Sequence, residues 1–161
     1  MQGHGGYGYG MWASPPEDDA HGPNGPRNVV YNCDVSSPKA GIWMGGMNEN
    51  WLILYNRFVV GDGPGVFAKT SSFDHIIKDN VFILKDSKSP MVHLATDDCI
   101  GVELIGNKLF GGSGQFVSGE GKPAAVEDNK AFGLGDTSRP GPEVPSIYQW
   151  QLKSLGISSS E

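Results

Sequence analysis

The chain has 161 residues, enough for one domain with a hydrophobic core, and its net charge of −6 without a basic run argues against a nucleic-acid partner. It contains 24 glycines and 11 prolines between short runs of Val, Ile, Leu and Phe, a composition typical of short strands joined by many turns. No stretch approaches 18 consecutive apolar residues, so no membrane span is expected, and the two cysteines do not indicate a disulfide framework.

The N-terminal part of the chain is rich in glycine and lacks the charged and apolar regions of a signal peptide. Residues 1–7 are expected to enter partway through the first structural repeat, and "GMWAS" at 10–14 is expected to contain its first strand. Residues 14–27, "SPPEDDAHGPNGPR", are interpreted as a long polar loop inserted after that strand.

An internal repeat is marked by asparagines that end short apolar runs. Five of them are separated by 24, 24, 27 and 22 residues, and each has an aliphatic residue three positions before it. Asparagine is depleted in strands but tolerates left-handed backbone at sharp corners, where stacked side chains can hydrogen-bond one another. The repeat therefore predicts one such corner per coil and an asparagine ladder along the stack. The predicted ladder consists of Asn32, Asn56, Asn80, Asn107 and Asn129.

A second set of apolar positions falls between the asparagines. In "GMWAS", "GIWMG", "GVFAK", "MVHLA" and "QFVSG", the second and fourth residues are expected to point inward, because the period of 2 is that of a strand. The first inward column consists of Met11, Ile42, Val66, Val92 and Phe116, and the second of Ala13, Met44, Ala68, Leu94 and Ser118.

Each repeat thus holds about three short strands separated by turns. This organisation predicts an all-β fold, a right-handed single-stranded parallel β-helix of about five coils that covers residues 1–132, with coils stacked at about 4.8 Å. A β-sandwich of irregular hairpins is the alternative, but it does not account for the fixed register of the asparagines.

The pattern of an aliphatic residue three positions before the asparagine and an apolar residue two positions after it resembles the pectate-lyase-like superfamily of right-handed parallel β-helix proteins, over about residues 8–132. That superfamily includes polysaccharide lyases, glycoside hydrolases, carbohydrate esterases, epimerases and phage or adhesion proteins. The resemblance implies a polysaccharide or oligosaccharide partner, commonly bound along the first sheet. It assigns no reaction, because one fold hosts many functions.

Residues 133–161 are interpreted as a Gly/Pro linker and a C-terminal tail, in which 147–156 form a terminal strand or a short capping helix. Solenoids need polar caps at their ends, and no amphipathic cap precedes Tyr7. We therefore expect a homo-oligomer that covers the open end, or a chain that belongs to a longer protein. A signal peptide on that longer protein would place it outside the cell or in the periplasm.

The residues between the two inward columns are expected to point outward in one line. Four consecutive coils place a ring on this line, with Val117 in the fifth coil. One interpretation is a sugar-stacking platform; the alternatives are that a loop such as 14–27 covers the rings, or that the rings stack on one another for stability. The predicted substrate-binding rings are Trp12, Trp43, Phe67 and His93.

Several charged residues lie near this line in the sequence. Lys69 or His93 could serve a lyase as the base, and Asp97 or Asp98 could serve a hydrolase with a carboxylate of the 14–27 loop. If the protein uses a metal, it is expected to be Ca²⁺ bound by oxygen ligands of that loop; otherwise no cofactor is expected. A solvated turn is the other interpretation of each charge. The candidate Ca²⁺ ligands are Glu17, Asp18 and Asp19.

The resemblance and the ring line together predict a polysaccharide-interacting β-helix, as part of a polysaccharide lyase or glycoside hydrolase. The alternative is a non-catalytic structural or adhesive β-solenoid module. An enzyme is expected to bring at least two charged groups together in a cleft beside the rings, whereas a structural solenoid is expected to cover its rings.

Overall fold

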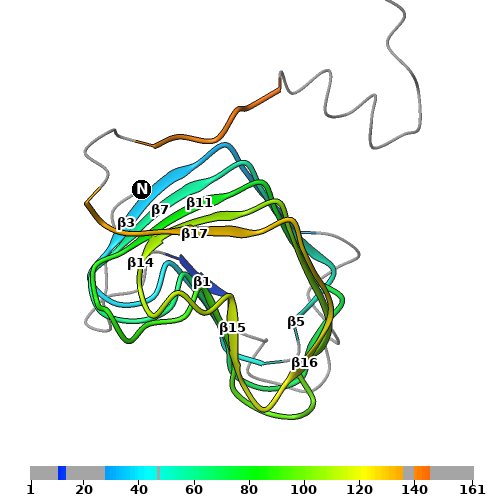
Figure 1. Cartoon of the computed structure of the whole chain (residues 1–161). Coiled ribbons are helices and arrows are strands. Elements are labelled where there is room, and N and C mark those ends of the chain that lie inside the picture. The colour runs from blue at the N-terminus through cyan, green and yellow to red at the C-terminus, as the bar shows by residue number, and fades with distance from the viewer. Residues whose placement is uncertain (1–10, 14–27, 47, 136–139, 146–161) are drawn as a thin grey trace, which may run out of the picture.

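The structure, a computed structural model, describes residues 11–13, 28–46, 48–135 and 140–145. The secondary structure of these residues is all β, and the parallel strands stack as a β-solenoid of about four turns (Figure 1). The predicted all-β coil architecture is therefore confirmed. The solenoid has about four turns, where the sequence predicts about five coils. Within the described residues, no helix is long and apolar enough to cross a membrane.

Three parallel sheets form the walls of the solenoid. In spatial order, sheet 1 consists of β1 (Met11–Ala13), β4 (Ile42–Met44), β8 (Val66–Ala68), β12 (Val92–Leu94) and β15 (Val117–Gly119). Sheet 2 contains β2 (Asn28–Tyr31), β6 (Trp51–Leu54), β10 (Ile76–Lys78), β13 (Ile100–Ile105) and β16 (Lys122–Glu127), with the short β5 (Asn48–Glu49) and β9 (Ser72–Phe73) joined to it through β13. Sheet 3 consists of β3 (Asp34–Ser37), β7 (Arg57–Val60), β11 (Val81–Leu84), β14 (Lys108–Gly111) and β17 (Lys130–Phe132).

The walls enclose a continuous apolar core. Buried and half-buried residues alternate along the strands, as in β8, where Val66 and Ala68 are buried on either side of the half-buried Phe67. Inside the solenoid, the rings of Phe58 and Phe82 stack with centroids 4.9 Å apart. Full burial of such a side chain contributes about 1.5–3 kcal/mol, so the contacts between successive coils stabilise the fold.

A row of asparagines runs along the corner between sheets 2 and 3. Asn56, Asn80 and Asn107 are fully buried. The Nδ2 of Asn80 donates to Ile53 O in the preceding coil at 2.7 Å and to Asn107 Oδ1 in the following coil at 3.0 Å. Asn129 extends the row, because its Oδ1 accepts a hydrogen bond from Asn107 Nδ2 at 2.9 Å. The row thus links successive coils through side-chain amides.

The predicted ladder position Asn32 does not belong to this row. The strand register places Cys33 in line with Asn56, and Cys33 N donates to Asn56 Oδ1 at 2.9 Å. Asn32 is exposed and has φ 49°, in line with Tyr55, whose φ is 54°. The prediction merged two neighbouring corner positions, because asparagine suits both the left-handed residue and the buried rung that follows it.

Close packing at the entrance to sheet 1 makes Gly65 the site of a first testable prediction. A Cβ on Gly65 would lie 2.2 Å from Phe82 Cδ1 and 2.8 Å from Met91 O. We expect Gly65→Ala to lower the free energy of unfolding by about 1–3 kcal/mol, because the core ring and the next coil must shift. Urea unfolding of Gly65→Ala beside Gly133→Ala, where a Cβ would meet nothing within 4 Å, measures this cost. Equal stability of the two variants would contradict the packing described.

Candidate functional site

The outward residues of sheet 1 form the line that the sequence predicts. Trp43, Phe67 and His93 lie directly opposite one another on β4, β8 and β12. All three are half-buried and sit between fully buried neighbours. The backbone of Trp12 pairs with that of Trp43. We call Trp43, Phe67 and His93 the ring row.

The rings of the row face one another. Trp43 and Phe67 stack with centroids 4.1 Å apart and an angle of 7° between their planes. Phe67 and His93 follow with centroids 5.2 Å apart and an interplanar angle of 30°. Both faces of the Phe67 ring are therefore covered by neighbouring rings.

At its far end the ring row continues into a polar group. His93 Nδ1 lies 2.7 Å from Ser118 Oγ, a hydrogen bond between adjacent coils. The register pairs Val117 with Val92 and Ser118 with His93, so the predicted outward position of Val117 and the predicted inward position of Ser118 are both wrong by one residue. The fifth coil thus contributes a hydroxyl to the line, where the sequence predicts an aliphatic side chain.

The charged candidates lie at the margin of sheet 1. Lys69 directly follows β8 and is exposed, as is Asp97 in the turn after β12. Asp98 Oδ2 accepts a hydrogen bond from Ser71 Oγ at 2.8 Å, and its Oδ1 accepts one from Thr96 Oγ1 at 2.5 Å. These hydroxyl bonds, first that of Thr96, lower the pKa of Asp98 below its ordinary value. Asp98 is therefore held as a carboxylate that joins two coils.

The acidic loop proposed for Ca²⁺ lies outside the described residues, as does the side chain of Trp12. Among the residues that the structure describes, no group of three or more His, Cys, Asp or Glu side chains could hold a metal ion. The loop residues concerned are Glu17, Asp18 and Asp19.

A buried histidine lies in the wall of sheet 2, between β9 and β10. His75 is 1% exposed, and its Nδ1 accepts a hydrogen bond from Trp51 N at 3.2 Å. Its Nε2 therefore carries the proton of the neutral ring, and within the described part of the chain neither this atom nor Trp51 Nε1 has a hydrogen-bond partner. Burial lowers the pKa of His75 to about 4. The neutral imidazole is thus part of the folded wall.

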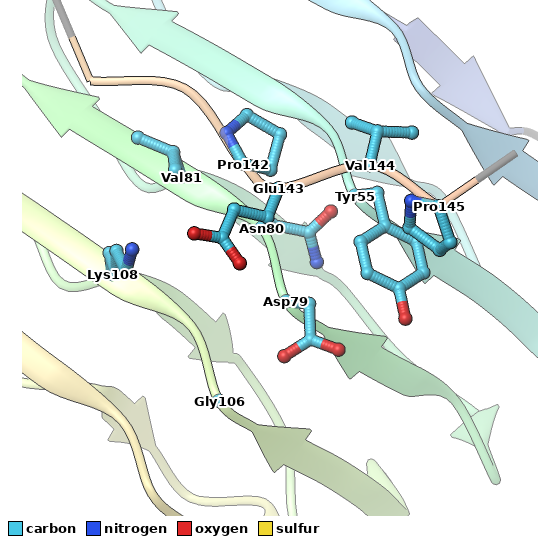
Figure 2. Close-up of a pocket in the computed structure, with 10 residues that line it drawn as sticks. All are labelled: Tyr55, Asp79, Asn80, Val81, Gly106, Lys108, Pro142, Glu143, Val144 and Pro145. Carbon is cyan, nitrogen blue, oxygen red and sulfur yellow. The ribbon is translucent and has the colours of Figure 1, made fainter.

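A second surface feature is a proline-rich segment, residues 140–145 (Pro-Gly-Pro-Glu-Val-Pro). The sequence predicts these residues as part of the linker. This segment, here named the strap, runs along the outside of the solenoid next to sheet 3 (Figure 1). Residues 142–145 of the strap line one side of a groove, as Figure 2 shows. The volume of this groove is about 570 Å³. No periodic signal marks the strap, because its partners are 83 to 114 residues away in the chain. The groove is lined by Tyr55, Asp79, Asn80, Val81, Gly106, Lys108 and strap residues 142–145.

No protein-family model, curated protein or solved structure matches this chain. The pectate-lyase-like superfamily is therefore not confirmed, and the parallel β-solenoid is what the structure establishes.

Proposed function

We propose that this chain is a non-catalytic β-solenoid module and that its ring row stabilises the stack of coils. The observation that supports this most is the coverage of Phe67, whose ring lies between those of Trp43 and His93. Stacked aromatic pairs contribute about 0.5–1.5 kcal/mol each beyond the area that they bury. The row therefore contributes to stability whether or not a ligand is present.

The same geometry disfavours a sugar-stacking platform on Phe67. A pyranose that stacks on an aromatic side chain needs a free ring face, and both faces of this ring are in contact with other rings. The part of Phe67 left to solvent is its edge. A ligand on this surface would have to contact ring edges and neighbouring polar groups.

The environment of Asp98 also favours a non-catalytic role. A general acid must hold a proton near neutral pH, whereas the hydrogen bonds of Asp98 lower its pKa and keep it ionised. Its two oxygens are already engaged by Ser71 and Thr96. Through Ser71, Asp98 links its own coil to the preceding one, which is a structural role.

Polysaccharide binding is the second candidate function, favoured by the position of a cation and hydrogen-bonding groups beside the half-exposed rings. Lys69 is exposed two residues after Phe67, and the pair of His93 and Ser118 lies in the following two coils. An acidic oligosaccharide lying along the solenoid axis could contact Lys69 and the imidazole together. This candidate assigns binding without a reaction.

Phe67→Ala tests the first proposal. We expect it to lower the free energy of unfolding by about 2 kcal/mol, because two ring contacts are lost together. Phe67→Leu is the matched control: it keeps apolar volume without the aromatic stack, and it should fall between Phe67→Ala and the unchanged chain in urea unfolding.

Tryptophan fluorescence, titrated with neutral and anionic oligosaccharides, separates the two candidates. The structural module predicts no saturable change at any sugar. A saturable change that Lys69→Ala abolishes, together with an unchanged stability of Phe67→Ala, would overturn the proposal in favour of polysaccharide binding.

A further inference from the structure

The strap contacts the solenoid through backbone carbonyls near its two ends. Arg57 Nε donates to Pro140 O at 3.2 Å, and the hydroxyl of Tyr31 donates to Pro145 O at 2.5 Å. Both donors come from the solenoid and both acceptors from proline residues. The solenoid thus binds the strap in part through the backbone of the strap.

The prolines are the less exposed residues of the strap. Pro140, Pro142 and Pro145 are half-buried, whereas the intervening Gly141, Glu143 and Val144 are exposed. Proline has a fixed φ and no N–H, so a proline-rich segment loses little conformational entropy on docking and needs no acceptor from its receptor. The three half-buried positions of the six-residue strap are thus all occupied by proline.

Contacts within the solenoid also position the residues that bind the strap. The Arg57 guanidinium is held by Asp34 Oδ1 at 2.8 Å from its Nη1, which leaves Nε to point at the strap. The rings of Tyr31 and Tyr55 pack edge to face with centroids 5.7 Å apart. Aromatic surfaces combined with donors for backbone carbonyls are a recurring way to bind proline-rich peptides.

The strap does not fill the surface beneath it. The groove of about 570 Å³ remains between its middle residues and the corner that contains Tyr55 and Asp79 (Figure 2). A segment attached by its ends over an open groove can be released without disturbing the core of the coils.

We propose that Tyr31, Tyr55 and Arg57 form a binding site for extended proline-rich peptides, and that the strap occupies this site in cis. The ligand is a peptide with prolines spaced as in the strap, which offers carbonyls to Arg57 and Tyr31. An intramolecular segment competes at an effective concentration in the millimolar range, so the strap sets the threshold for a partner in trans. This inference is independent of the role of the ring row, which lies on sheet 1.

The first experiment uses the full-length chain with residues 140–145 replaced by Gly-Ser-Gly-Ser-Gly-Ser. The probe is a fluorescein-labelled hexapeptide, Pro-Gly-Pro-Glu-Val-Pro, measured by fluorescence anisotropy. We expect saturable binding that is at least about tenfold tighter than to the unchanged chain, since the cis competitor is absent. A folded replacement chain, verified by circular dichroism, that shows no binding up to millimolar peptide would overturn the proposal.

Two matched substitutions in the replacement chain locate the site. Tyr31→Phe removes only the hydroxyl that bonds Pro145 O and should weaken peptide binding about fivefold. Ser118→Ala removes a hydroxyl of sheet 1 that bonds His93, outside the proposed site, and should leave peptide binding within about twofold. Equal effects of the two substitutions would contradict the assignment.

A second measurement needs no replacement of the strap. A glutamate-specific protease cuts after Glu143, and the docked strap should slow that cut in the unchanged chain. Adding the hexapeptide with Gln in place of its Glu should displace the strap and accelerate cleavage after Glu143 several-fold. Cleavage at the same rate with and without saturating peptide would overturn the proposal.

Discussion

Asn80→Ala should lower the free energy of unfolding by about 3–5 kcal/mol, because several buried polar groups lose their partner at once. Asn80 Oδ1 accepts from Asn56 N at 2.8 Å and from Asn56 Nδ2 at 2.9 Å. Its Nδ2 donates to Ile53 O and to Asn107 Oδ1. Alanine would leave these groups unpaired inside the corner, where water is excluded.

Urea unfolding of Asn80→Ala measures this loss, and Asn32→Gly is the control. Asn32 is exposed at φ 49°, a backbone conformation that glycine adopts without strain, so its replacement should change stability by less than about 0.5 kcal/mol. A large loss at Asn32 with a small one at Asn80 would show that the rung has been assigned to the wrong residue.

Acidification is the second large effect, through His75. Its folded-state pKa of about 4 lies below the ordinary 6.5, so between these values the unfolded chain binds a proton that the folded chain excludes. The free energy of unfolding should therefore be highest above pH 6.5 and fall by about 1.4 kcal/mol per pH unit towards pH 4, about 3 kcal/mol in total.

Urea midpoints at pH 7, 6, 5 and 4.5 test this dependence. His75→Gln should remove most of the slope in this window, whatever its effect on stability at pH 7. Asn32→Gly, which alters no ionisable side chain, is the control and should keep the slope of the unchanged chain. A slope that persists in His75→Gln would assign the effect to other groups.

The coil period and the inward columns could be predicted because a solenoid repeats the same local environment in each coil. Ile42, Val66 and Val92 occupy the same position in successive coils and are all buried. Such agreement between coils is visible in the sequence as pairs of apolar residues two positions apart that recur in every coil. This repetition is the physical reason why a parallel β-solenoid can be predicted from a single sequence.

One position in each end coil, the asparagine corner of the first and the sheet 1 strand of the fifth, is shifted by one residue for a related reason. In the first coil Val29 is 47% exposed and Val30 is 7% exposed, and both are equally suitable aliphatics in the sequence. In the fifth coil the neighbours Phe116 and Val117 offer the same ambiguity. A coil at the end has a neighbour on one side only, so its register is less constrained by pattern.

The geometry of the ring row could not be predicted from the repeat. Alternation along a strand tells which side of the sheet a residue occupies, but it does not fix the side-chain torsions that orient a ring. Phe67 is on the predicted side, and the structure adds that its faces are covered by Trp43 and His93. The strap could not be predicted from the sequence, because it has no periodic pattern and its contacts join residues far apart in the chain.

The row of asparagines has a consequence for how such a chain can change in length. Its rungs Asn56, Asn80, Asn107 and Asn129 are 24, 27 and 22 residues apart, yet they meet in register along the corner. The segments that connect the strands differ in length from coil to coil, and this accounts for the difference in residue number. Since each coil contacts only its neighbours, a gene segment that begins and ends at equivalent rungs can be duplicated or deleted in phase. Recombination at this corner can therefore add or remove whole coils while the contacts within the remaining core stay the same.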